Sequence, residues 1–182
     1  KRTLKGVSWS FVDNLAGSGI SFLVGLVLAR LLSPSEFGII GMITIFIAIS
    51  NSIVDSGFSN ALIRKLDAEK KDYDTVFIFN LFISLVLFFI LFLSAPAISY
   101  FFKEPQLIPI TRAMGLILIF NAFGIIQSTL LIKTIDFKTQ TKISIVASLG
   151  SGIIGVGMVI YGSGVWSLVA QQVSRQFLNS LF

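Results

Sequence analysis

The 182-residue chain contains no cysteine and no histidine. The lack of cysteine excludes disulfide bonds, thiolate metal sites and a cysteine nucleophile. The lack of histidine removes the commonest general base and the commonest metal ligand. Charged residues make up only 13% of the chain, whereas a typical soluble domain has about 25%. A soluble enzyme, a secreted disulfide-rich scaffold and a disordered tail are therefore poor interpretations.

Hydrophobic residues make up 54% of the chain and form long continuous runs. A membrane-spanning helix needs about 20 mostly apolar residues, and these runs lack the alternation of β-barrel strands. We expect an all-α, polytopic membrane helix bundle that forms one transmembrane domain. The six predicted spans cover residues 6–32, 37–63, 75–98, 107–132, 143–161 and 165–182. Because the last run is still apolar where the sequence stops, we expect the chain to be a piece of a longer protein.

The connections between these spans are predicted to be short. Pro34 follows Ser33 and is expected to open a helix, because proline suits the first helical position. Loops are predicted at residues 64–74, 99–106, 133–142 and 162–164.

The basic residues are distributed unevenly between the two ends of the spans. Ten lie on one side, namely Lys1, Arg2, Lys5, Arg64, Lys65, Lys70, Lys71, Lys133, Lys138 and Lys142. Three lie on the other side, namely Arg30, Lys103 and Arg112. Basic loops stay in the cytoplasm, so the N-terminus and the loops at 64–74 and 133–142 are predicted to be cytoplasmic. The aromatic residues lie within the spans and not between basic residues, so the net charge of +5 does not indicate nucleic-acid binding.

Several polar side chains fall inside the apolar spans, where they normally face the bundle interior or a water-filled cavity. Asp13 and Asp55 are predicted to lie at similar depth on adjacent helices, from the rise of about 1.5 Å per residue. The candidate substrate- or ion-binding residues in the first four spans are Asp13, Asn14, Asn51, Asp55, Asn80, Asn121 and Gln127. They predict a polar cavity open to the cytoplasm. For the amides, hydrogen bonding between helices is the alternative.

Arg175 lies near the middle of the sixth predicted span. An arginine at that depth needs a counter-charge or a wet cavity, which Asp13, Asp55 or an anionic ligand would supply. The alternative is that its side chain extends to the cytoplasmic face.

Small residues mark the first and fifth spans. In the first span, Asp13, Gly17, Ser21, Gly25 and Ala29 follow one another at spacing four. Such a stripe allows close helix packing. The fifth span is also glycine-rich, and the alternative there is that Gly152, Gly155 and Gly157 are hinges, because transporter helices can be broken.

Signatures of enzymes are missing from the chain. It has no GxxxxGK[ST] phosphate loop, and nothing around Asp13 and Asp55 supports a catalytic acid pair. We therefore expect no catalytic residue, no metal and no cofactor.

Four segments carry a resemblance to a known family. They read GVSWS at residues 6–10, LARLLSPSEFG at 28–38, DSGFSNALIR at 55–64 and GVWSLV at 164–169. In this order and spacing they resemble the polysaccharide and lipopolysaccharide biosynthesis flippases of the multidrug/oligosaccharidyl-lipid/polysaccharide exporter superfamily. The resemblance implies that this chain is the N-terminal six-helix half of a transporter with 12 or more helices around a central cavity.

The resemblance also implies a function. Members move an undecaprenyl-pyrophosphate-linked oligosaccharide to the outer leaflet of the bacterial inner membrane by alternating access. They draw on membrane potential or on a coupling ion, H⁺ or Na⁺. Charged cavity residues recur in the family, and here Asp13, Asp55, Arg64 and Arg175 are the candidates.

The candidate residues suit such a substrate. A pyrophosphate favours arginine or lysine, sugar hydroxyls favour amides, and Asp55 is a candidate for the coupling ion. Two alternatives stay open: a drug or cation antiporter of the same superfamily, and a membrane scaffold without transport activity.

Overall fold

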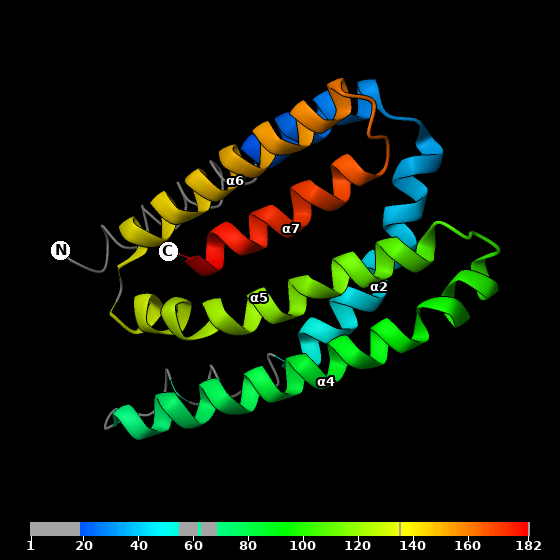
Figure 1. Ribbon diagram of the computed structural model, residues 1–182. Helices are drawn as coiled ribbons and strands as arrows, with labels where there is room; N and C mark the ends of the chain where they lie inside the picture. The colour runs from blue at the N-terminus through cyan, green and yellow to red at the C-terminus, as the bar shows by residue number, and fades with distance from the viewer. Residues whose placement is uncertain (1–18, 55–61, 63–68, 135, 182) are drawn as a thin grey trace.

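The computed structural model describes residues 19–54, 62, 69–134 and 136–181. These residues form helices joined by short turns, and no strand occurs among them (Figure 1). A first helix covers Gly19–Leu31. The others are α2 (Pro34–Val54), α4 (Lys70–Phe102), α5 (Leu107–Lys133), α6 (Phe137–Ile160) and α7 (Trp166–Leu181). The predicted all-α helix bundle is confirmed.

Four of the described helices have the length and apolarity needed to cross a membrane. They are α2, α4, α5 and the Lys138–Ile160 part of α6. The helix α4 has 33 residues, which gives a length of about 50 Å, more than the hydrocarbon core of about 30 Å. α4 is therefore long enough to extend beyond the apolar layer.

The helix ends correct three of the predicted loops. The expected loop at 64–74 is helical from Lys70 onward, and the loop at 99–106 shrinks because α4 continues to Phe102. The expected loop at 133–142 is shorter in the structure, since α5 ends at Lys133 and α6 begins at Phe137.

Polar residues at these ends continue the helices instead of breaking them. The Glu69 N–H donates to Asp72 Oδ2 over 2.9 Å at the start of α4. Before α6, the Thr139 N–H donates to Asp136 Oδ1 over 3.2 Å, and the Thr139 hydroxyl donates to Asp136 Oδ2 over 2.7 Å. Such caps satisfy the free backbone N–H groups of a first turn. Hydropathy thus marks the apolar part of a helix and not its full length.

Pro34 opens α2, as expected. The Ser33 N–H and hydroxyl both donate to Glu36 Oε2, over 2.7 Å and 2.8 Å. The second oxygen of this carboxylate, Oε1, lies 2.6 Å from the position that a Cβ on Gly164 would occupy. Gly164 also has a φ of +53°, which a side chain disfavours. Two of the segments that carry the family resemblance, 28–38 and 164–169, therefore meet at this end of the bundle.

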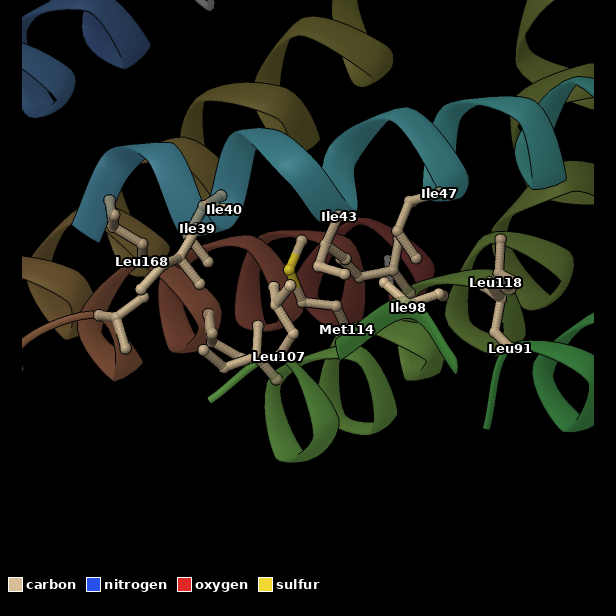
Figure 2. Close-up of a cluster of buried hydrophobic side chains, with 14 of the residues drawn as sticks. Ile39, Ile40, Ile43, Ile47, Leu91, Ile98, Leu107, Met114, Leu118 and Leu168 are labelled. Atoms are coloured by element: carbon tan, nitrogen blue, oxygen red, sulfur yellow. The ribbon is translucent and has the colours of Figure 1, made fainter. Parts of the chain in front are cut away.

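α4 and α5 form an antiparallel hairpin, and α7 lies between α5 and α6 (Figure 1). On α2, Ile39, Ile43 and Ile47 face a core that includes Met114 and Leu118 of α5 (Figure 2). In lipid, close van der Waals packing holds such a core together, because the acyl chains are as apolar as leucine.

The outer surface of α4 is strongly apolar. Ile78, Phe82, Phe89 and Leu93 are between 58% and 75% exposed. A soluble protein rarely exposes so continuous an apolar face, so this surface fits contact with lipid.

Candidate functional site

Three amide side chains form a hydrogen-bonded chain across three helices. Asn121 on α5 donates from Nδ2 to Oδ1 of Asn51 on α2 over 3.0 Å. Gln176 on α7 donates from Nε2 to Oδ1 of Asn121 over 3.2 Å. We call Asn51, Asn121 and Gln176 the amide chain. These hydrogen bonds join α2, α5 and α7. Because the three side chains are half-buried, the polar region that they form is partly enclosed.

Two of these residues, Asn51 and Asn121, were candidates from the sequence, and the fold brings them into contact. The third, Gln176, was missed. The spacing of polar residues in the sequence could have identified it. Gln172, Arg175, Gln176 and Asn179 stand at positions i, i+3, i+4 and i+7 and therefore share one helix face. We call these four residues the polar face of α7.

Arg175 lies next to the amide chain on this polar face and is half-buried. Within the part of the chain that the structure describes, no carboxylate forms an ion pair with it. An arginine on a helix that packs between two others needs water or an anion near its guanidinium. This environment makes Arg175 the strongest candidate of the described residues for binding an anionic group.

Asn80 on α4 is completely buried, and both polar atoms of its amide lack a hydrogen-bond partner among the described residues. Contacts between Phe77 and Phe123 (ring centroids 5.9 Å apart) and between Phe88 and Gly115 fix the antiparallel register of α4 and α5. This register places Asn80 at about the level of Asn121 along the bundle. No hydrogen bond joins the two amides.

Gln127 is exposed on α5 and makes no hydrogen bond with the described residues. It is therefore outside the amide chain. Four further candidates lie outside the described residues, namely Asp13, Asn14, Asp55 and Arg64.

The glycine candidates on α6 differ in their surroundings. A Cβ on Gly152 would lie 2.7 Å from Val24 Cγ2 on the first helix, and one on Gly155 would lie 3.0 Å from Gln171 Cβ on α7. A Cβ on Gly157 would meet open space. Gly152 and Gly155 thus fit the close-packing interpretation, and α6 is continuous through all three. A hinge at Gly157 stays a prediction.

Lys133 joins elements at the end of the bundle that carries the predicted cytoplasmic loops. Its Nζ donates to the Tyr73 hydroxyl over 3.2 Å and to the Leu62 carbonyl over 3.4 Å, and lies 5.6 Å from the Tyr73 ring centroid. The start of α4 and the end of α5 are therefore fixed to each other, at the same end of the molecule. No cluster of three or more metal-ligating side chains occurs among the described residues.

A family model described as polysaccharide biosynthesis protein matches residues 27–182. The chain belongs to the polysaccharide biosynthesis protein family. Membership confirms the family resemblance seen in the sequence, and the matched region contains all the described helices from α2 to α7.

Curated relatives of this family member come from bacteria. The chain is 28% identical to the succinoglycan biosynthesis transport protein ExoT of Rhizobium meliloti, over 94% of the chain and 35% of the relative. It is 26% identical to an uncharacterized membrane protein in the cps region of Klebsiella pneumoniae, over 78% of the chain and 29% of the relative. It is 22% identical to the lipopolysaccharide biosynthesis protein WzxC of Escherichia coli, over 99% of the chain and 36% of the relative.

The chain thus spans about a third of the length of these relatives. No solved structure matches it significantly. Its apolar helices and its membrane-protein relatives identify this family member as a multi-pass membrane protein.

Proposed function

We propose that the chain forms part of a transporter that moves an undecaprenyl-pyrophosphate-linked oligosaccharide across the bacterial inner membrane. The observation that carries the proposal is the amide chain beside Arg175, in a member of the polysaccharide biosynthesis family. Amides pair with sugar hydroxyls, and a guanidinium pairs with phosphate oxygens in bidentate fashion. One partly enclosed region therefore offers both kinds of group that a sugar-pyrophosphate needs.

The signs of the described charges favour an anionic substrate. Every carboxylate of the described residues lies at a helix end or in a turn, namely Glu36, Glu69, Asp72, Asp74, Glu104 and Asp136. The charges that lie furthest from the ends of the described helices are all basic, namely those of Arg112, Lys142 and Arg175. A drug or cation antiporter needs acidic groups in its cavity, so this alternative has no support from the described helices.

In the proposed transporter, Arg175 binds the pyrophosphate, and Asn51, Asn121 and Gln176 bind sugar hydroxyls. Asn14, Asn80 and Gln127 are further sugar-binding candidates, and Arg64 is a second cation for the pyrophosphate. The lipid tail stays in the bilayer, so only the head group needs the polar route. Translocation breaks no covalent bond, and the protein therefore works without catalytic residues or a cofactor.

The proposal also covers the coupling ion and the orientation of the chain in the membrane. Asp13 and Asp55 bind the coupling ion, H⁺ or Na⁺. The N-terminus and the Lys70 end of α4 lie in the cytoplasm. A cysteine placed at Lys70 is expected to stay unlabelled by an impermeant thiol reagent in intact cells and to react after lysis. Labelling in intact cells would reverse the orientation.

The function is tested in proteoliposomes that contain the complete protein and a fluorescent undecaprenyl-pyrophosphate oligosaccharide. We expect the wild type to move the labelled lipid between leaflets and Arg175→Gln to slow the movement at least tenfold. Arg30→Gln is the matched control, since Arg30 is exposed at the end of the first helix. Wild-type protein that leaves the labelled lipid in its original leaflet, with a cationic dye moved instead, would reject the proposal.

A further inference from the structure

The buried face of α4 changes from polar to apolar along the helix. Asn80 and Ser84 are both completely buried, and their spacing of four places them on one helix face. Leu91, Ala95 and Ile98 continue this face toward the end of α4 and are also buried. The polar part is therefore about one helical turn long. We call Asn80 and Ser84 the α4 polar pair.

Three polar atoms of this pair have no hydrogen-bond partner among the described residues. They are Nδ2 and Oδ1 of Asn80 and Oγ of Ser84. Burying a polar group without a hydrogen bond costs free energy, so native proteins contain few such groups. Departures from this rule are expected at functional sites. Three unpaired atoms within one turn therefore indicate a state of the protein in which these atoms find partners.

The neighbouring part of α5 offers no free polar partner. The antiparallel register of the hairpin places the α4 polar pair at the level of residues 116–123. The buried residues of that segment, Ile117, Leu118 and Ala122, are apolar. Its amide, that of Asn121, is already bonded within the amide chain. The partners of the pair therefore do not come from α5 in this conformation.

The interface between α2 and the α4–α5 hairpin lies at the same level. α2 and α5 are the main neighbours of α4 among the described helices, so the buried face of α4 is turned toward them (Figure 1). The core contacts of α2, which include Ile39, Ile43 and Ile47, all precede Asn51 (Figure 2). Asn51 itself is joined to Asn121 by a hydrogen bond. Apolar packing thus holds most of α2 to the hairpin, and a polar contact joins them beyond it.

We propose that Asn80 and Ser84 form a second sugar-binding subsite, which is occluded in this conformation and opens when the Asn51 end of α2 separates from the hairpin. The inference rests on the proposed function and adds this subsite to it. Separation breaks the bond between Asn51 and Asn121 but exposes three unpaired atoms to hydroxyl groups, which offsets the loss. An amide and a hydroxyl both donate and accept hydrogen bonds. The uncharged pair therefore suits the sugar and not the pyrophosphate.

Binding to the complete, detergent-purified protein tests the subsite. Undecaprenyl pyrophosphate is titrated with and without its oligosaccharide. We expect Ser84→Ala to weaken binding of the oligosaccharide form about fivefold, the effect of one hydrogen bond, and to leave the sugar-free form unchanged. Ser167→Ala is the matched control, since Ser167 is also completely buried and its Oγ is unpaired among the described residues. Unchanged affinity in Ser84→Ala, or an equal loss for both ligands, would overturn the subsite.

Cysteine labelling tests the opening in the absence of substrate. This chain has no cysteine, and any cysteine in the rest of the protein is replaced by serine. Asn80→Cys and Ala95→Cys occupy completely buried positions on one face of α4. A minor conformation is about 0.1–10% populated, so we expect N-ethylmaleimide to label Asn80→Cys slowly and Ala95→Cys about tenfold more slowly. Equal rates would contradict an opening at this level.

A failure of the subsite differs from a failure of the proposed function. If the wild type moves the labelled oligosaccharide lipid and Ser84→Ala binds it as tightly, only the subsite is rejected. If the wild type moves a cationic dye instead, the proposed function is rejected and the subsite with it. If Asn80→Leu lowers the free energy of unfolding, a trapped water molecule pairs the amide, and the occluded subsite is wrong.

Discussion

Asn121 on α5 donates a hydrogen bond to Asn51 on α2, with 3.0 Å between Nδ2 and Oδ1. The two residues are 70 positions apart in the sequence. Asn121 also accepts from Gln176, so its amide uses both a donor and the acceptor. In this conformation two hydrogen bonds link the three amides. In the proposed transporter, a sugar hydroxyl that enters between two of these amides can donate to one and accept from the other, so neither amide loses its hydrogen bond.

The amide chain is expected to stabilise the bundle. Asn121→Leu removes both hydrogen bonds and leaves Asn51 and Gln176 without this partner. A hydrogen bond between membrane helices is worth about 0.6 kcal/mol on average, and unpaired partners add to the loss. We expect the free energy of unfolding in mixed micelles to fall by about 1–2 kcal/mol. Gln127→Leu, on an exposed site of the same helix, is the control and should cause no loss. Equal effects of the two changes would show that the amide chain does not contribute to the free energy of unfolding.

Asn80 is expected to behave in the opposite way. Its buried amide is unpaired among the described residues, and leucine has a similar size without polar atoms. Asn80→Leu should therefore raise the free energy of unfolding, by about 1–3 kcal/mol. The measurement is the same unfolding experiment, with Ile83→Leu as a half-buried, apolar control on the same helix. A loss of stability would mean that a bound water or ion satisfies the amide.

The glycines of α6 give a matched pair of substitutions. In Gly152→Ala the new Cβ would lie 2.7 Å from Val24 Cγ2, so we expect destabilisation by about 1–3 kcal/mol from overpacking. Gly157→Ala meets open space and should stabilise the helix by about 0.5–1 kcal/mol. Thermal unfolding measures both. If Gly157 is a hinge, Gly157→Ala slows transport even though the protein is more stable; unchanged transport rejects the hinge.

The cap of α6 makes stability depend on pH. Hydrogen bonds from the Thr139 hydroxyl and then from the Thr139 N–H lower the pKa of Asp136 below its ordinary value of 3.8. A carboxylate with a lowered pKa in the folded state stabilises the fold above the ordinary value. This contribution is lost as the pH falls from 3.8 through the lowered pKa. The unfolding temperature of Asp136→Asn should therefore fall less than that of the wild type between pH 5 and pH 3. Parallel curves would contradict the role of this cap.

The number and order of the described helices follow from the apolar runs. Their ends do not, because polar residues such as Asp72 and Asp136 extend a helix through its caps. Pro34 is the exception, since proline has a specific preference for the first helical position. The sequence also indicated close packing at Gly152 and Gly155, because small residues in a membrane helix usually serve that purpose.

The candidate site was only partly predictable. Asn51, Asn121 and Arg175 were identified because polar groups inside apolar runs are costly. Gln176 was missed, although its spacing from Gln172, Arg175 and Asn179 marks a polar helix face. Gln127 was selected by the same reasoning and proves to be exposed, because hydropathy shows that a residue lies in a span but not which way it faces.

By itself, the sequence determined that the chain forms several apolar helices in a membrane. It also determined which polar residues stand within them. These properties depend on residue type and on position along one helix. Only the tertiary structure decided that Asn51, Asn121 and Gln176 touch while Asn80 is buried without a described partner. Those contacts depend on the rotation and register of one helix against another. Packing between helices sets both, and no local pattern along the chain specifies them.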